Sequence, residues 1–309
     1  MRFQILSLDG GGIKGLFSAA VLAHLEEDFD VKISDHFDLI VGTSTGGIIA
    51  LGLGIGMTPR EIMQFYISKG PKIFPNKRMY GIRQLYRNKY NPFELEHALK
   101  ECFGEKRLAE SRKRLVIPSY NIGEDNVYLF KTPHHEDLKR DYKVPIWKVA
   151  MATSAAPTYL PVFSGVDNIR LIDGGVWANN PTMVGIVEAV SKLNMSLDNI
   201  RILSLGTTSE IKNRRKKLDH GGIWQWKSDG IDVVLRGQSI GAYTQAQHLL
   251  GKEQIIRIDP VVPDGLFKLD KLSEEDLLAK AAHESRISTP KIRELFIDHK
   301  APDFTPKYV

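Results

Sequence analysis

Three short motifs on this chain contain the residue types that acyl transfer requires. Gly10-Gly11-Gly12-Ile13-Lys14-Gly15 comes first, Gly42-Thr43-Ser44-Thr45-Gly46 follows, and Asp173-Gly174-Gly175 comes last. A glycine-rich turn can present backbone N–H groups to an oxyanion, a serine can act as a nucleophile, and a carboxylate can accept the serine proton. Together the three motifs supply the complementary groups of an acyl-transfer site.

Ser44 lies between a predicted strand and a predicted helix. Residues 37–41 form a short apolar run typical of a buried strand, and residues 47–53 continue as a helix. Gly42 and Gly46 flank the serine as in a nucleophile elbow, where only glycine avoids a clash with the serine backbone. The turn would place the Ser44 hydroxyl at a helix N-terminus, which favours developing negative charge. Taken alone, the motif also fits a small-residue turn that packs a helix on a sheet.

The glycine loop fits two kinds of site. Gly10, Gly12 and Gly15 match the dinucleotide-binding fingerprint, between a predicted strand at 3–8 and a predicted helix at 16–25. Alternatively, the N–H groups of Gly10, Gly11 and Gly12 could form an oxyanion hole. The fingerprint expects an acidic residue at the end of the second strand, whereas here that strand runs into the elbow. We therefore favour the oxyanion hole and keep a nucleotide-binding module as the alternative.

Asp173 follows the apolar run 169–172, so it lies at the C-terminal end of a predicted strand. Functional groups of open α/β sheets collect at such ends, although an Asp-Gly pair alone is typical of an ordinary turn. A serine hydroxyl must lose its proton as it attacks, and a positioned carboxylate can accept it. Because a carboxylate with a pKa of about 4 is a weak base, we expect burial to raise the pKa of Asp173.

The histidines offer an alternative base. Four of the nine follow Asp173 in the chain, so the order Ser, Asp, His of a hydrolase triad is available. These four are His220, His248, His283 and His299. None lies in a predicted strand-end loop with small flanking residues. We therefore favour a Ser44–Asp173 dyad, with a general serine esterase that uses a Ser-His-Asp triad as the alternative.

Strands and helices alternate along the chain, which is typical of an α/β fold. The remaining predicted strands are 114–122, 127–131, 200–205 and 254–258. The remaining predicted helices begin at the capping box Thr58-Pro59-Arg60-Glu61 and at Asn91-Pro92, and cover 145–152, 181–193, 231–250 and 273–285. This order places all three motifs at strand ends.

Composition predicts one globular domain over residues 1–309. The chain is 42% hydrophobic, enough to bury a large core, and Cys102 is its single cysteine, which indicates a reducing compartment. The N-terminus lacks the pattern of a signal peptide, and no apolar run is long enough to span a bilayer. The acidic residues are scattered and no zinc-type spacing occurs, so we expect no metal cofactor. These features predict a cytoplasmic protein.

The net charge of +5 is modest, but one stretch is strongly basic. It consists of Lys212, Arg214, Arg215, Lys216 and Lys217, and Trp224 and Trp226 follow it. Basic side chains attract anionic headgroups by about 1 kcal/mol each, and tryptophan favours the membrane interface. The stretch could therefore dock the protein on a membrane, or it could be a solvated loop with tryptophans packed in the core.

The three motifs, with Ala152-Thr153-Ser154-Ala155-Ala156-Pro157 between the second and the third, resemble the patatin-like phospholipase family. The likeness spans about residues 5–185. It implies a three-layer α/β sandwich with a mostly parallel central sheet and helices on both faces. It also implies a Ser44–Asp173 dyad without histidine, and an oxyanion hole at Gly10, Gly11 and Gly12. Lys14, Gly15, Gly42, Gly46, Gly174 and Gly175 belong to the supporting motifs.

The resemblance implies membrane phospholipids as substrate, attacked peripherally at the inner membrane surface. Short bacterial members of the family include phospholipases that cyclic dinucleotides activate in antiphage defence, and this chain is similar to them in compactness. A cyclic dinucleotide activator is therefore a further expectation, for which the sequence assigns no binding residues. We expect no DNA or RNA partner, and leave open a homo-oligomer and the role of residues 186–309.

Overall fold

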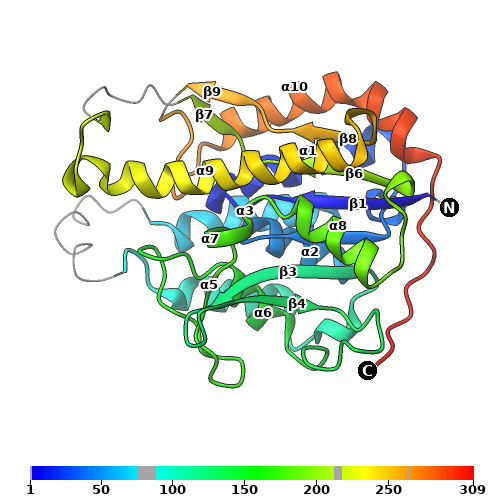
Figure 1. Ribbon diagram of the computed structural model, residues 1–309, viewed down its shortest axis with the longest axis horizontal. Helices are drawn as coiled ribbons and strands as arrows, with labels where there is room; N and C mark the ends of the chain where they lie inside the picture. Colours follow the sequence, from blue (N-terminus) through cyan, green and yellow to red (C-terminus); the bar gives the residue numbers. More distant parts are fainter. Residues whose placement is uncertain (1, 76–87, 212–217, 264) are drawn as a thin grey trace.

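The computed structural model describes residues 2–75, 88–211, 218–263 and 265–309 (Figure 1). Within these residues a central sheet has the strand order β4-β3-β2-β1-β6-β8, and β5 also pairs with β3. Its strands are β1 (Phe3–Leu8), β2 (Leu39–Gly42), β3 (Arg114–Asn121), β4 (Asn126–Lys131), β5 (Leu171–Asp173), β6 (Ile200–Leu205) and β8 (Ile255–Ile258). A separate pair consists of β7 (Ser209–Ile211) and β9 (Val261–Pro263).

The sheet is mostly parallel. β1 pairs in parallel with β2 and β6, β2 with β3, and β6 with β8, whereas β4 and β5 run antiparallel to β3. The carboxyl ends of β1, β2 and β6 therefore lie together at one edge of the sheet, which is where ligands bind in open α/β folds. Residues 186–309 contribute β6 and β8 to this sheet.

Helices cover both faces of the sheet, so every residue of β1 is buried. Phe3 and Ile5 of β1 belong to a core cluster that contains residues of α8 and α9, whereas Leu6 and Leu8 belong to the cluster of the opposite face. Figure 1 shows α8 and α9 together on one side of the sheet. The helices are α1 (Gly15–Phe29), α2 (Thr45–Gly54), α3 (Pro59–Ile73), α5 (Pro92–Phe103), α6 (Ile146–Thr153), α7 (Gly175–Ala178), α8 (Thr182–Ser191), α9 (Ile223–Leu250) and α10 (Glu274–Ile292).

The predicted mostly parallel sheet with helices on both faces is confirmed. The capping box before α3 is also present, since Thr58 Oγ1 accepts from the Glu61 amide at 3.2 Å. Several boundaries differ from the prediction, most of all at α9, which begins at Ile223, and at α10, which ends at Ile292. The helix α7 was not predicted, and the strand before Asp173 is β5, which includes that residue. The three residues of β5 pair with the C-terminal end of β3. Pairing between the strands, rather than the apolar run, therefore determines where β5 begins and ends.

A buried ion cluster joins the carboxyl ends of β1 and β8. Arg257 donates to Asp9 Oδ2 at 2.7 Å, to Asp259 Oδ2 at 2.8 Å and to Ser204 Oγ at 2.8 Å. Burial raises the pKa of Asp9 to about 6, although the Arg257 charge acts in the opposite direction. A buried carboxylate of this kind depends on its counter-charge.

We expect Arg257→Met to lower the free energy of unfolding by about 3–5 kcal/mol at pH 8, because it leaves the buried Asp9 carboxylate and the partly buried Asp259 carboxylate without their cation. The loss should shrink at pH 5, since Asp9 is then protonated and needs no counter-charge. Urea unfolding at both pH values measures this. Arg60→Met, which removes an exposed pair with Glu27, should cost about 1 kcal/mol or less. Equal losses in the two variants would contradict the ion cluster's role.

Candidate active site

Ser44 occupies a strained turn between β2 and α2. Its φ of 55° and ψ of −121° lie outside the conformations that a non-glycine residue ordinarily adopts. A Cβ at Gly42 would come within 2.2 Å of the Gly46 carbonyl oxygen, and one at Gly46 within 2.2 Å of the Leu8 carbonyl oxygen. The two glycines thus allow the turn to close tightly against the end of β1. The local geometry is that of the nucleophile elbow expected from the sequence.

Ser44 and Asp173 contact each other directly. The Ser44 hydroxyl donates to Asp173 Oδ2 at 2.6 Å, and the Gly175 amide donates to Asp173 Oδ1 at 2.7 Å. Asp173 is 6% exposed. Burial raises its pKa to about 6, against the opposing effect of the two hydrogen bonds. The expected rise in the pKa of Asp173 is therefore present, and its carboxylate is placed to accept the serine proton.

The segment 153–155 holds both members of this pair. Thr153 Oγ1 accepts from the Ser44 amide at 2.9 Å and donates to the Pro118 carbonyl at 2.6 Å. Two residues on, the Ala155 carbonyl accepts from the Asp173 amide at 3.0 Å. Thr153 is fully buried, so these bonds are shielded from water. One short segment thus fixes the backbone of the serine and that of the aspartate.

Gly174 and Gly175 bring the backbone after Asp173 close to its neighbours. A Cβ at Gly174 would lie 2.3 Å from the Pro118 carbonyl oxygen, so any side chain there would push β5 away from β3. A Cβ at Gly175 would lie 3.0 Å from Asp173 Oδ1. Glycine at both positions therefore allows the turn to bend back and the Gly175 amide to reach the carboxylate.

The glycine loop lies against Ser44, but its three amides are not equivalent. The Gly10 amide donates to the Asn179 carbonyl at 3.0 Å, so in this conformation it is engaged within the protein. In the part of the chain that the structure describes, the amides of Gly11 and Gly12 bond to no protein acceptor. The Gly10 amide is thus not available to an oxyanion in this conformation, whereas the predicted role of Gly11 and Gly12 as oxyanion donors stays a prediction. The spacing of the sequence could not show that the Asn179 carbonyl would accept the hydrogen bond of the Gly10 amide.

The end of β6 supports the glycine loop from the other side. Thr207 Oγ1 donates to the Gly10 carbonyl at 3.1 Å, and the Lys14 ammonium donates to the Thr208 carbonyl at 2.9 Å. Lys14 is thus a buried anchor of the loop. A Cβ at Gly15 would lie 2.1 Å from Thr45 Oγ1, so this glycine lets the start of α1 approach α2.

The histidine alternative finds no support in the geometry. Among the described residues no histidine bonds to Ser44 or Asp173. His134 instead contacts Glu188 at 2.9 Å, and His299 contacts Asp38 at 2.7 Å. Cys102 packs against the core, with its sulfur 3.7 Å from that of Met57.

Other expectations from the sequence have different outcomes. The basic residues between 212 and 217 lie outside the described residues, and Trp226 is 38% exposed. The described residues contain no cluster of three His, Cys, Asp or Glu side chains arranged to hold a metal. None of the helices formed by these residues combines the length and apolarity of a membrane span.

Sequence reasoning missed three residues that shape the site. Thr153 lies within the small-residue segment 152–157, but nothing in its spacing identifies Ser44 as its partner. Thr207 follows β6, and its place at the carboxyl end of a strand next to β1 was the available signal. Asn179 directly precedes the helix start predicted at Asn180-Pro181. Its carbonyl contacts the Gly10 amide only through the tertiary structure, so the local sequence carries no signal for this contact.

The comparisons with known proteins agree with the fold. The model of the family described as patatin-like phospholipase matches residues 6–186. A cGAMP-activated phospholipase of Escherichia coli (strain TW11681) is 36% identical to this chain over 97% of the chain and 94% of the relative. Another, of Pseudomonas aeruginosa (strain BWHPSA011 / Pa011), is 32% identical over 85% and 80%. The crystal structure of VipD from Legionella pneumophila has a similar fold, with a TM-score of 0.52 at 14% identity over 97% of this chain and 67% of that one.

We expect Asp173 to titrate with a midpoint near pH 6, so that its carboxylate form is lost as the pH falls through this value. In Ser44→Ala the midpoint should rise further, because the lost hydrogen bond stabilises the ionised form. Carbon-13 NMR of the labelled carboxyl group measures both midpoints. Ser68→Ala, which removes a hydroxyl that bonds within α3, serves as the control. A wild-type midpoint near 4 would show that Asp173 is solvated.

Proposed function

Because the chain belongs to the patatin-like phospholipase family, we propose that it hydrolyses fatty acyl esters of membrane phospholipids with Ser44 as nucleophile and Asp173 as general base. The family resemblance predicted from the motifs is confirmed by the match over residues 6–186. The observation that carries the residue assignment is the 2.6 Å hydrogen bond from the Ser44 hydroxyl to a buried carboxylate of raised pKa.

In the first half of the reaction, Ser44 Oγ attacks the ester carbonyl carbon while Asp173 Oδ2 takes the hydroxyl proton. The carbonyl oxygen becomes an oxyanion, and the amides of Gly11 and Gly12 are its proposed donors. As the tetrahedral intermediate collapses, the bond to the leaving alcohol breaks. Asp173 returns the proton to that alcohol, and the acyl group remains on Ser44.

In the second half, water attacks the acyl-enzyme carbonyl and Asp173 accepts its proton. Collapse of the second intermediate releases the fatty acid, and the proton returns to Ser44 Oγ. Asp173 is thus used twice as base and twice as acid. Its pKa of about 6 suits this alternation near neutral pH better than the value of about 4 of a free aspartate.

Ser44→Ala should lower the hydrolysis of phospholipid vesicles by on the order of 10⁶-fold, because it removes the nucleophile. Asp173→Asn should lower it by about 10²–10⁴-fold, because an amide cannot accept the proton. Mass spectrometry of the fatty acid released from phosphatidylethanolamine and phosphatidylglycerol vesicles gives both rates.

Ser154→Ala is the matched control for the nucleophile. Ser154 is a buried serine, and its own hydroxyl bonds to no described group. It should retain activity. Turnover by Ser44→Ala at the wild-type rate would exclude the dyad. Faster hydrolysis of short water-soluble esters than of vesicles would favour the general serine esterase.

We further propose that a cyclic dinucleotide activates this phospholipase, as part of antiphage defence. Support comes from the names of relatives that align over most of the chain, both of which are cGAMP-activated phospholipases. Coverage of 97% of this chain means that the alignment with the E. coli protein extends into residues beyond the matched family model. The part of the relative that lies outside the catalytic core therefore has a counterpart here.

Addition of cGAMP should raise the rate of fatty acid release from vesicles by at least about tenfold, because it would shift the protein toward a competent state. The assay compares cGAMP with cyclic di-AMP and with buffer at equal vesicle concentration. Ser44→Ala with cGAMP is the control for contaminating lipase. The same rate with and without every dinucleotide would remove the activation proposal and leave the hydrolase intact.

A further inference from the structure

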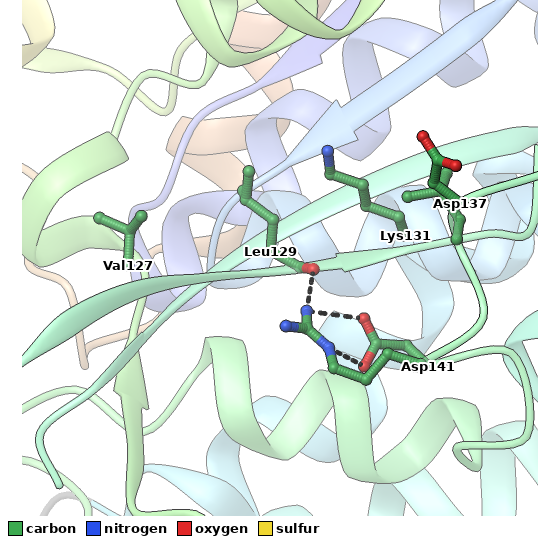
Figure 2. Close-up of a pocket in the computed structure, with 7 residues that line it drawn as sticks. Val127, Leu129, Lys131, Asp137 and Asp141 are labelled. Atoms are coloured by element: carbon green, nitrogen blue, oxygen red, sulfur yellow. Dashed lines mark hydrogen bonds and ion pairs between the residues drawn. The ribbon is translucent and has the colours of Figure 1, made fainter. Parts of the chain in front are cut away.

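One cavity outside the Ser44–Asp173 pair, of about 330 Å³, runs along β4 (Figure 2). Its charged groups already have protein partners. The Arg140 guanidinium donates to both carboxylate oxygens of Asp141 and to the Leu129 carbonyl, as the dashed lines show. Lys131 is paired with Glu188, and Asp137 with Lys192. None of the side chains that line this β4 cavity is a buried polar group without a partner, so nothing in its wall calls for a ligand.

Another cavity, of about 250 Å³, lies between the glycine loop and α9. We call it the α9 cavity. It opens where β1, β6 and β8 end, at the edge of the sheet where open α/β folds bind ligands. Its walls are formed by Asp9, Gly10, Lys14, Asn179, Thr207, Thr208, Ser209, Glu210, Asp232, Leu235, Arg236, Ser239, Ile240, Tyr243, Arg257 and Asp259.

Thr208 in this wall lacks the partner that a buried hydroxyl needs. It is 4% exposed, and within the described chain its Oγ1 bonds to no group. The hydroxyls on either side are engaged, Thr207 with the Gly10 carbonyl and Ser209 with Asp259. Thr208 also adopts a φ of 76°, which is costly for a β-branched residue. Strain and an unpaired hydroxyl in one cavity wall point to a ligand that supplies the missing bond.

The side chains of the α9 cavity suit a flat heteroaromatic group. The cavity is lined by three cations and four carboxylates, and the cations Lys14, Arg236 and Arg257 are already bonded to protein oxygens, so the cavity does not favour a phosphate. The polar side chains of the cavity instead include both hydrogen-bond donors and hydrogen-bond acceptors. From α9, Leu235, Ile240 and Tyr243 add an apolar and aromatic wall. A nucleobase combines an apolar face with a polar edge and meets both demands.

We propose that the α9 cavity binds a guanine base of the activating nucleotide. Guanine carries N–H donors for a carboxylate and acceptors for Arg236 and the Thr208 hydroxyl on its edges. The volume lies below the ~300–1,000 Å³ of pockets for whole drug-sized ligands, so one base enters while the phosphates stay at the rim. This inference rests on the proposal that a nucleotide activates the enzyme.

The base would act on the active site through Asn179. The Asn179 amide donates to Gln238 Oε1 at 3.1 Å and its side chain donates to Ser239 Oγ at 3.2 Å, both on α9. Its carbonyl in turn accepts from the Gly10 amide. Gly10 itself lines the cavity. A base bound against α9 would therefore affect, through Asn179, the position of the loop that contains the proposed oxyanion donors.

The test is calorimetric binding of cGAMP, GMP, AMP and inorganic phosphate to the full chain. Thr208→Val keeps the shape but removes the hydroxyl, and Arg236→Gln removes the cation. Each should weaken cGAMP binding by at least about tenfold, and GMP should bind more tightly than AMP. Arg140→Gln in the β4 cavity is the matched control and should keep wild-type affinity. Melting temperatures identify any variant that fails to fold. If one of the two cavity variants does not fold, the affinity of the other one tests the site.

The outcomes separate this site from the proposals on which it rests. Wild-type affinity in both Thr208→Val and Arg236→Gln would overturn the α9 cavity and leave nucleotide activation standing. Loss of affinity in Arg140→Gln alone would place the site along β4. Phosphate or phosphoethanolamine that displaces GMP at equal concentration would overturn base recognition in favour of a headgroup site. A protein that hydrolyses vesicles yet binds no nucleotide would remove the activation and this site but keep the hydrolase.

Discussion

The hydrogen bond between the Ser44 hydroxyl and the Asp173 carboxylate is the interaction on which the rest of the site depends. A carboxylate is a useful base for serine only if it is partly desolvated, and desolvation is costly unless the surrounding structure is well ordered. The fold meets this demand by burying Asp173 at the end of a short strand and by giving its second oxygen the Gly175 amide. The pKa of about 6 is the balance between burial and these two hydrogen bonds.

Close backbone approach is the second requirement, because the serine and aspartate come from segments 129 residues apart. Ser44 stays in its strained turn because its amide is bonded to Thr153, while Gly42 and Gly46 let the turn pack without a side chain. The strain is thus stored locally and opposed by buried hydrogen bonds. A side chain at these glycines would meet backbone oxygen rather than a flexible side chain, so little relaxation is available.

Local patterns in the sequence were sufficient for the elements that carry the motifs. The apolar run before Ser44, the glycines around it and the capping box at Thr58 each act within a few residues, and each forms as expected. The exceptions involve distant partners. Asn179 takes the Gly10 amide across the fold, and Thr153 reaches Ser44 over 109 residues, so no periodicity encodes either contact. The limits of β5 were likewise set by pairing with β3.

The glycine loop is the part of the site that the C-terminal residues control. Thr207 and Lys14 bind the loop to the end of β6, and the Leu269 carbonyl accepts from the Ile13 amide at 2.8 Å. The serine and aspartate are already in contact, so a regulator has little to change between them. The Gly10 amide, by contrast, is held by Asn179, which α9 holds in turn. On the proposed mechanism, the structure therefore favours a ligand that acts on the glycine loop, which contains the proposed oxyanion donors, over one that acts on the Ser44–Asp173 pair.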